Sequence, residues 1–355
     1  MAVDYKKELI ELIDVVVSEA GSDLHFAVES HPIVRVSGSL IPLVKKPVLT
    51  QTDIEGFAKA LMHDEKYKEF QENKEIDFSY SASDGIRFRG NGFMQSGKMG
   101  IALRLIPNKI RTIEELNLPP ILESFIQRPQ GFFLCVGPVG QGKSTTLAAM
   151  VEVINQSRAE HIVTIEDPIE YIYEPKKSLI DQREIGTDTN SFEAALSSAF
   201  RQDVDVILVG EMRNSETIGT AVTAAETGHL VLSTLHTNNA AQTIDRIIDS
   251  FPSDQQDQIR VQLAGSLTGI FSQRLVPRIS GGLVPAYELL INNSAISNLI
   301  REARTHEIQT VIETGMEQGM IDMNRSLAQL VKDGEITVEN AFAYSINPKG
   351  LERII

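Results

Sequence analysis

The sequence predicts an α/β protein of two domains, in which a small α+β domain precedes a larger domain built on a mostly parallel sheet. With 355 residues, the chain is long enough for about two domains that each bury a core. A proline-containing segment separates two regions with different strand and helix patterns. After that segment, short apolar strands alternate with helices, which is typical of a parallel sheet with helices on both faces.

The composition limits the possible functions. The net charge of −15 disfavours a general binder of polyanions such as a nucleic-acid translocase. A single cysteine, Cys135, excludes an intramolecular disulfide and a zinc site made of several cysteines. No apolar stretch approaches the roughly 20 residues of a spanning helix, and acidic residues interrupt the N-terminal segment. We therefore expect a cytoplasmic protein.

The first domain is expected at residues 1–105. It begins with a helix whose apolar residues recur at helical spacing, namely Leu9, Ile10, Ile13, Val16 and Val17. Short β-like runs at 22–26 and 32–43 precede a helix at about 52–72. Further strands are expected at 76–80, 86–95 and 101–107. Strands with intervening helices indicate an α+β domain.

A linker is expected at 106–118 and a second domain at 119–355. Its expected elements are a strand at 131–137, a helix at 143–157, a strand at 161–168, a helix at 191–202, and strands at 205–211 and 229–236. The tail from about 254 is expected to be helical, most clearly at 253–275, 294–304 and 323–334. This pattern predicts a RecA-like domain with a helical C-terminal portion.

Residues 137–146, GPVGQGKSTT, match the phosphate-binding pattern G-x-x-x-x-G-K-[ST] at a strand-to-helix junction. The glycines allow backbone N–H groups to surround phosphates at the start of a helix. Lys143 is expected to reach the terminal phosphates of ATP, and Ser144 to bind Mg²⁺. The predicted nucleotide-binding residues are Gly137, Pro138, Val139, Gly140, Gln141, Gly142, Lys143, Ser144 and Thr145.

Acidic residues follow two of the expected strands. Glu211 comes after the apolar run VILVG, and Glu166, Asp167 and Glu170 lie in TIEDPIE. Several carboxylates near a triphosphate would repel it unless some hold Mg²⁺ or activate water. We therefore expect one general base and one acid in the metal shell.

Two histidines, His229 and His236, bracket the strand LVLSTL. A histidine beside an apolar strand is more often a packed core residue than a catalytic one. Alternation along the strand places the two on different faces, so different roles are expected. His236, between Leu235 and Thr237 at the strand's end, is the better candidate for sensing the γ-phosphate.

Several segments together resemble the secretion ATPase superfamily, and within it the motors that retract type IV pili. They are GPVGQGKSTTLAAM, TIEDPIEY, VGEMRN, GHLVLSTLHTNNAAQTIDR and SAISNLIRE, with SDLHF and RFRGNGF in the first domain. The resemblance implies a PAS-like first domain. It also implies that Glu170 polarises the attacking water, that Glu211 supports Mg²⁺, and that His229 and His236 form a histidine box.

The resemblance implies a nucleotide role for Arg89 and Arg104, which are 15 positions apart on two expected strands. Solvated charges on a strand are the simpler alternative. A guanidinium delivered by a mobile domain would neutralise charge that develops on the phosphates.

SAISNLIRE resembles a helix that retraction motors need for retraction rather than for hydrolysis. The residues are Ala295, Ile296, Ser297, Asn298, Leu299, Ile300, Arg301 and Glu302. Simple packing of an apolar face formed by Ala295, Ile296, Leu299 and Ile300 is the alternative. The chain departs from the family pattern at Ser297, and also at Val139, Gln141 and Asn214.

The resemblance therefore implies a homohexameric ATPase at the cytoplasmic face of the inner membrane. Its partner would be the platform protein of the pilus (PilC-like), and no nucleic acid is expected. The accessory retraction ATPase of the same superfamily is an alternative. Extension and type II secretion ATPases carry a four-cysteine zinc subdomain that this chain lacks. Outside the motors, a small-molecule phosphotransferase remains the alternative.

Overall fold

The computed structural model describes residues 4–36, 38–82, 85–106 and 109–355. Two compact units are present. One comprises Met1–Lys109 with Glu170–Ile172, and the other comprises Ile110–Ile169 with Tyr173–Ile355. Residues 107–108 of the expected linker lie outside the described residues. The predicted fold class, a strand-rich first domain and a mostly parallel α/β second domain, is confirmed.

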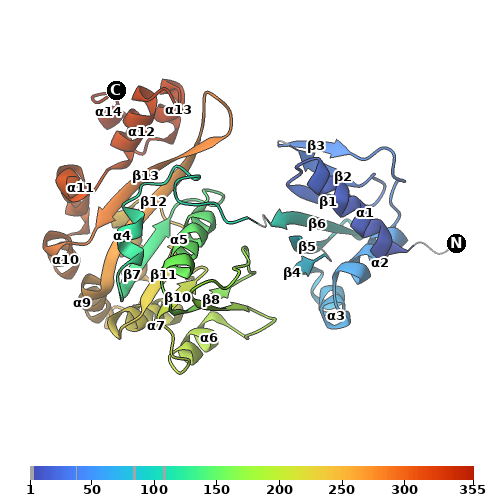
Figure 1. Ribbon diagram of the computed structural model, residues 1–355, viewed down its shortest axis with the longest axis horizontal. Helices are drawn as coiled ribbons and strands as arrows, with labels where there is room; N and C mark the ends of the chain where they lie inside the picture. The colour runs from blue at the N-terminus through green and yellow to red at the C-terminus, as the bar shows by residue number, and fades with distance from the viewer. Residues whose placement is uncertain (1–3, 37, 83–84, 107–108) are drawn as a thin grey trace. The chain divides into compact units, whose positions relative to one another are not determined.

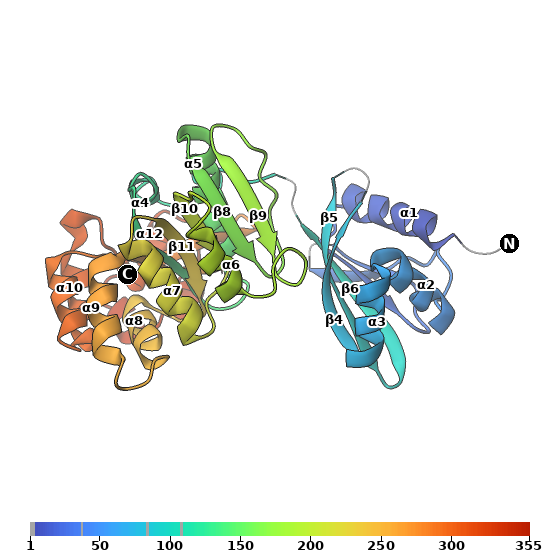
Figure 2. The same cartoon turned by 90° about the horizontal axis from the view of Figure 1, so that it is seen from below.

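The first unit contains a six-stranded antiparallel sheet with the order β3-β2-β1-β6-β5-β4 (Figure 1). The strands are β1 Asp23–Ala27, β2 Ile33–Val36, β3 Ser39–Pro42, β4 Glu75–Ser81, β5 Arg87–Gln95 and β6 Lys98–Ile106. The helices are α1 Tyr5–Ser18, α2 Gln51–Leu61 and α3 Asp64–Asn73. All three pack on one face of the sheet, where they enclose a common apolar core (Figure 2).

Two expectations for this unit were wrong. The buried face of α1 is Leu9, Leu12, Ile13 and Val16, whereas Ile10 and Val17 are exposed. The helix expected at 52–72 is broken into α2 and α3, because Met62 has extended backbone angles and ends α2. Asp64 and Glu65 then start a new helix, where carboxylates favour the N-terminal turn.

The second unit contains a seven-stranded sheet with the order β13-β12-β7-β11-β10-β8-β9, parallel except for the β12–β13 pair. The strands are β7 Gly131–Val136, β8 His161–Glu166, β9 Leu179–Glu184, β10 Val206–Val209, β11 Leu230–Leu235, β12 Leu267–Pro277 and β13 Leu283–Ile291. The helices are α4 Leu122–Ile126, α5 Lys143–Ser157, α6 Phe192–Ala199, α7 Ser215–Glu226, α8 Ala240–Asp249, α9 Gln256–Ser266, α10 Ser294–Arg301, α11 Ile308–Thr314, α12 Met323–Lys332, α13 Val338–Tyr344 and α14 Pro348–Leu351, with 3-10 helices at Thr305–Glu307 and Met316–Gln318. Across the described residues, no helix is both long and apolar enough to cross a membrane.

Alternate residues of the central strand β7 point to opposite faces. Phe132, Leu134 and Val136 join a core that also receives residues from α6 to α11. On the opposite face lie α4 and α5, the helix that follows the phosphate-binding sequence (Figure 1). A smaller core joins the ends of β12 and β13 to α12, α13 and α14. The sheet is thus covered on both faces, as the alternation predicted.

The helix expected at 253–275 was wrong in its second half. Helix α9 ends at Ser266, and β12 begins directly at Leu267. β12 pairs with β7 on one side and β13 on the other, and its first seven residues are buried. These seven residues, LTGIFSQ, mix apolar and polar types with no period of two, so the sequence pattern did not distinguish the strand from a helix.

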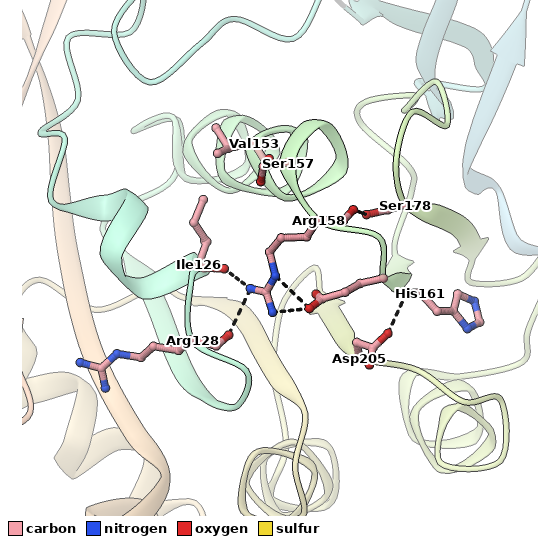
Figure 3. A network of polar contacts seen from close by, with 9 residues as sticks. Ile126, Arg128, Val153, Ser157, Arg158, His161, Ser178 and Asp205 are labelled. Carbon is pink, nitrogen blue, oxygen red and sulfur yellow. Dashed lines mark hydrogen bonds and ion pairs between the residues drawn. The ribbon is translucent and has the colours of Figure 1, made fainter.

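A polar network fixes the far end of α5 (Figure 3). Arg158, which follows α5, donates its Nη1 to the backbone oxygens of Ile126 and Arg128 at the end of α4. Its Nε donates to Glu160 at 2.9 Å. The Ser178 hydroxyl donates to the backbone oxygen of Arg158 at 2.7 Å. The helix that begins at the phosphate loop is therefore held at its other end by side-chain contacts.

Candidate nucleotide-binding site

The loop between β7 and α5 has the backbone of a phosphate cradle. Gly137, Gly140 and Gly142 have φ angles of 150°, 76° and 77°, which side chains rarely adopt. A Cβ on Gly137 would lie 2.4 Å from the backbone oxygen of Gln273. A Cβ on Gly140 would meet no atom within 4 Å. The loop therefore lies directly on β12 at one end and opens to free space at Gly140.

The phosphate loop is hydrogen-bonded to β12 through the side chains of Gln141 and Gln273. Gln273 is buried, and its Nε2 donates to the backbone oxygen of Gln141 at 2.8 Å. The Thr146 hydroxyl donates to Gln273 Oε1 at 2.6 Å. In turn, Gln141 Oε1 accepts from the backbone N–H of Leu275 at 2.7 Å. Gln141, a departure from the family pattern, thus anchors the loop, and Gln273 is a site residue that sequence reasoning missed.

The ammonium group of Lys143 is buried within the loop. It donates to the backbone oxygens of Gly137 and Pro138, both at 2.9 Å. It also lies 3.3 Å from Nδ1 of His236. Because an ammonium group has only donors, Nδ1 accepts and the ring proton lies on Nε2.

Glu211 completes this set from the next strand. Nε2 of His236 lies 3.5 Å from a carboxylate oxygen of Glu211. The other carboxylate oxygen accepts from Arg213, a hydrogen bond that raises the pKa of this arginine. Before Glu211, a Cβ on Gly210 would lie 3.2 Å from the backbone oxygen of Ile165. Glycine at this position therefore allows close approach to the end of β8.

Lys143, His236 and Glu211 thus meet at the carboxyl ends of parallel strands, where ligands of α/β sheets bind. Helix α5 starts at Lys143 after Gly142, which has no side chain to cap it. Its first turn carries Ser144 and Thr145, and the start of a helix favours phosphate. The Ser144 hydroxyl and the Glu211 carboxylate are oxygen donors of the kind that Mg²⁺ prefers. These residues fit a nucleotide with its magnesium ion.

His229 is not brought together with His236. It precedes β11, and its backbone oxygen accepts from the N–H of Gly131 at the start of β7. Its Nδ1 donates to the backbone oxygen of Ala224 at 3.0 Å, and its ring meets the edge of Phe200. Since a strand rises about 3.3 Å per residue, His229 lies ~20 Å from the phosphate end of β11. Within this chain it is a packed residue at the opposite edge of the sheet.

The segment TIEDPIE begins in β8 and leaves it after Glu166. Glu166 is buried and accepts from the Thr164 hydroxyl at 2.7 Å. The Asp167–Pro168 peptide bond is cis. Glu170 follows, half-buried, and is grouped with the first unit rather than with the sheet that carries Lys143. Its role as general base stays a prediction.

Arg89 and Arg104 belong to the sheet of the first unit, on β5 and β6. They are direct cross-strand partners, and both project from the face opposite the helices. Arg104 donates its Nε to Asp23 at 2.9 Å. Arg89 lies 3.9 Å from a carboxylate oxygen of Asp77. The structure thus brings the two arginines side by side within one domain.

The segment 295–302 forms helix α10 and the residue after it. Ile296, Leu299 and Ile300 are buried in the large core, but Ala295 is exposed, which corrects the apolar face expected from the sequence. The departing residue, Ser297, donates its hydroxyl to the backbone oxygen of Ala264 at 2.9 Å. The exposed residues of the segment are Ala295, Asn298, Arg301 and Glu302.

Asn214, another departure, starts helix α7 shortly after Glu211. Its Oδ1 accepts from the N–H of Thr217, and its Nδ2 donates to Glu193 at 2.8 Å. The Thr217 hydroxyl donates to the same oxygen of Glu193. These two hydrogen bonds, first from Thr217 and then from Asn214, lower the pKa of Glu193 to about 2. An aspartate at 214 would face that carboxylate with a like charge.

Cys135 lies in the middle of β7 and is fully buried. Burial raises the pKa of its thiol to about 12, so it is a core residue and not a nucleophile.

A family model described as type II/IV secretion system protein matches residues 7–282. The type IV pilus retraction ATPase PilT of Pseudomonas aeruginosa is 43% identical over 334 residues, which are 94% of this chain and 97% of that protein. The type IV pilus ATPase PilU of the same organism is 40% identical over 349 residues, or 98% and 91% of the two chains. A crystal structure of the pilus retraction motor PilT with bound ADP has a TM-score of 0.90 at 46% identity, covering 97% of this chain and 98% of that one.

These matches extend across both units, and they confirm the resemblance that the motifs indicated. The chain belongs to the family of type II/IV secretion system proteins.

Proposed function

We propose that this protein is an ATP-hydrolysing motor that powers retraction of type IV pili. The observation that carries the proposal is the contact of Lys143, His236 and Glu211 at the phosphate loop, in a chain whose relatives include a pilus retraction ATPase. The loop binds ATP, and the Ser144 hydroxyl and Glu211 hold Mg²⁺. Bound magnesium supplies charge neutralisation at the transferred phosphate.

Within this proposal, the residues divide the chemical work. Lys143 leaves the backbone oxygens of Gly137 and Pro138 to contact the terminal phosphates, because a phosphate offers a stronger acceptor than two carbonyls. His236, held between Lys143 and Glu211, reports whether a γ-phosphate is present. Glu170 is the general base for the attacking water. Arg89 and Arg104 contact the phosphates and carry the nucleotide state to the first domain.

We further propose that the motor is a homohexamer at the cytoplasmic face of the inner membrane. Its partner is the PilC-like platform protein, and the exposed residues of helix α10 serve retraction rather than hydrolysis. A ring of subunits that open and close in turn would move such a partner in discrete steps. The proposal includes no nucleic-acid partner, in line with the net charge of −15.

Deletion of the protein tests its place in the pilus system. Hyperpiliated cells that do not twitch support retraction, whereas bald cells point to pilus extension instead. Retraction that persists after the deletion would favour the alternative of an accessory retraction ATPase. Light scattering measures the oligomeric state. A protein that is strictly monomeric and still has full ATPase activity would exclude the ring and favour the phosphotransferase.

The Glu170→Gln variant tests the chemistry. It should bind ATP like the parent protein and lose turnover by ~10²–10⁴-fold, because the general base is gone while the phosphate loop is intact. Turnover and ATP affinity are measured on the same preparation. Normal turnover in this variant would overturn the assignment of Glu170.

A further inference from the structure

Glu288 places a carboxyl group inside the large core of the second unit. It lies on β13 and is 1% exposed, and its Oε1 accepts from the backbone N–H of Ala240 at 2.9 Å. Its Oε2 is buried and has no hydrogen-bond partner among the described residues. An ionised oxygen that is buried without a partner is costly, whereas a protonated one is neutral and carries a donor. The geometry therefore favours the uncharged acid.

The hydroxyl group directly opposite Glu288 does not bond to it. Ser272 on β12 is the cross-strand partner of Glu288, so the two side chains project from the same face of the sheet. The Ser272 hydroxyl is buried and, across the residues that the structure describes, has no hydrogen-bond partner of its own. A carboxylate attracts such a donor, because a charged acceptor forms the stronger hydrogen bond. The unpaired hydroxyl is thus a second observation in favour of the uncharged acid.

The charged groups around Glu288 also oppose an anion there. The two that act on it are both acidic, namely Asp322 before α12 and Glu313 on α11. On β12, Arg274 is engaged elsewhere, since its Nη2 donates to Oδ1 of Asn238 at 3.1 Å. Burial first, and then these two carboxylates, raise the pKa of Glu288 to about 7, although the hydrogen bond from the α8 backbone acts to lower it. The charged side chains of α8 are exposed, and they are Asp245, Arg246 and Asp249.

The backbone that Glu288 holds is close in sequence to His236. Ala240 is the first residue of α8, and its side chain is buried in the same core. His236 precedes it by four positions, and its ring contacts the phosphate loop. The short segment between them is fastened to α8, because the hydroxyls of Thr237 and Thr243 are hydrogen-bonded at 2.7 Å. A displacement of the start of α8 therefore moves the segment that carries His236.

We propose that Glu288 is a positioning residue for ATP hydrolysis, which in its uncharged form fastens the start of α8 to β13 and so holds His236 at the phosphate loop. The proposal rests on the ATPase function above. Ionisation of Glu288 leaves an uncompensated charge in the core, and this charge favours separation of α8 from β13. Efficient turnover therefore requires the proton of Glu288.

The Glu288→Gln variant of the full-length protein tests this role through pH. Its amide keeps an acceptor for the N–H of Ala240 and is uncharged at every pH. Its turnover of ATP should match that of the parent at about pH 6 and exceed it by about threefold or more at about pH 8.5, where only the parent ionises at this position. The ratio of the two rates cancels titrations that both proteins share, such as that of the nucleotide. A ratio that stays constant over this range would contradict the proposal.

The matched control is Glu335→Gln, which removes a carboxylate from the ion pair with Arg278 in the same unit. Its turnover relative to the parent should not change with pH. A rise equal to that of Glu288→Gln would mean that any lost carboxylate has this effect, and the specific role of Glu288 would be wrong.

The charge of Glu288 is measured directly by infrared spectroscopy. The parent minus Glu288→Gln difference spectrum at about pH 6 should contain the C=O stretch of a protonated carboxyl group, and this band should disappear at about pH 8.5. Because the pKa in the folded protein lies above the ordinary value of 4.5, the stability that the proton supplies is complete below pH 4.5 and is lost as the pH rises through about 7. The parent should therefore melt increasingly below Glu288→Gln over this range. A difference spectrum without the band would overturn the proposal.

A double-variant cycle tests whether Glu288 acts through His236. Glu288→Leu removes the acceptor of the Ala240 N–H, so turnover at about pH 6 should fall about tenfold, while ADP affinity stays within about twofold because the phosphate loop is intact. Added to His236→Ala, the same change should lower turnover by less than about twofold. Losses that multiply would contradict the proposal. Circular dichroism checks the fold, and if Glu288→Leu does not fold, the pH dependence of Glu288→Gln decides alone.

The Lys143→Ala variant distinguishes a failure of this proposal from a failure of the proposed function. If Lys143→Ala keeps full turnover, the phosphate loop is not the site of hydrolysis and the proposed function fails. If Lys143→Ala abolishes turnover while Glu288→Gln follows the parent at every pH, the ATPase stands and only the role of Glu288 is wrong.

Discussion

The phosphate-loop edge of the second unit and one row of side chains in the first unit are held in place by different interactions. This row, here called the arginine row, crosses the sheet and consists of Arg35, Asp23, Arg104 and Arg89. At the loop edge, Lys143 is buried, its ammonium bonds to backbone oxygens, and the loop is locked to β12 by Gln273. In the row, Arg104 is mostly exposed and its orientation depends on one carboxylate. The loop is thus preorganised by backbone geometry, whereas the row is organised by charge.

The largest expected difference between the two regions concerns nucleotide binding itself. Lys143→Ala should weaken ADP binding by ~10–100-fold, since a charge-assisted hydrogen bond to a phosphate is lost. Arg104→Gln should leave ADP affinity within twofold yet lower turnover by ~10²–10³-fold. Titration with ADP and steady-state kinetics measure the two effects. Equal loss of ADP affinity in both variants would mean that the two regions do not divide binding and turnover between them.

The Gln273→Ala variant removes contacts that hold the phosphate loop in shape, but it changes no residue that is proposed to bind phosphate. Gln273→Ala leaves the Thr146 hydroxyl and the backbone oxygen of Gln141 without their partner, at a cost of ~1–3 kcal/mol for each group that stays buried. The melting temperature should fall and KM for ATP should rise about tenfold. Gln309→Ala, on the exposed side of α11, is the control. An unchanged KM would show that the loop keeps its shape without β12.

The two regions should also differ in how strongly salt affects their contribution to ATP turnover. The Debye length shortens from ~14 Å at 50 mM salt to ~4 Å at 500 mM, so interactions of exposed charges are screened more than those of buried ones. The turnover of the parent protein should therefore fall a few-fold over this range, and the turnover of Arg104→Gln should change less. A parallel loss in both would mean that salt acts elsewhere than on the arginine row.

The sequence signals that mark the loop edge are local. The glycines, Lys143 and Glu211 follow apolar strands at short, recognisable spacings. The contacts that hold the loop come from far along the chain, since Gln273 and Gln141 are 132 positions apart. The sequence did not indicate strand β12, because its first seven residues are all buried and its apolar and polar residues do not alternate.

The same limit applies to the charged residues. The sequence singled out Arg89 and Arg104, but the partner of Arg104 is Asp23, 81 positions earlier. His229 was paired with His236 by motif, although the length of β11 keeps the two at opposite edges of the sheet. Sequence spacing shows which residues share a strand. Which residues meet across strands follows only from the sheet order.

The smallest expected effect comes from Asn214, which supports the segment that carries Glu211. Asn214→Asp keeps the cap on Thr217 but replaces the donor to Glu193 with a second carboxylate. The pKa of Glu193 lies at about 2, below its ordinary value of 4.5, so its contribution to stability is complete above pH 4.5 and is lost as the pH falls toward 2. The variant should therefore unfold at a temperature a few degrees lower than the parent at pH 7, a loss of ~1 kcal/mol.

That difference in melting temperature should shrink as the pH is lowered from 7 to 3.5, because the added aspartate becomes protonated and the repulsion of Glu193 ends. Adding Glu193→Gln to Asn214→Asp should restore much of the stability at pH 7, since an amide at 193 donates to the new carboxylate. Calorimetric melting of the three proteins (the parent, Asn214→Asp and the double variant) at both pH values gives the comparison. A difference that widens on acidification would show that the departure at Asn214 does not serve the charge of Glu193.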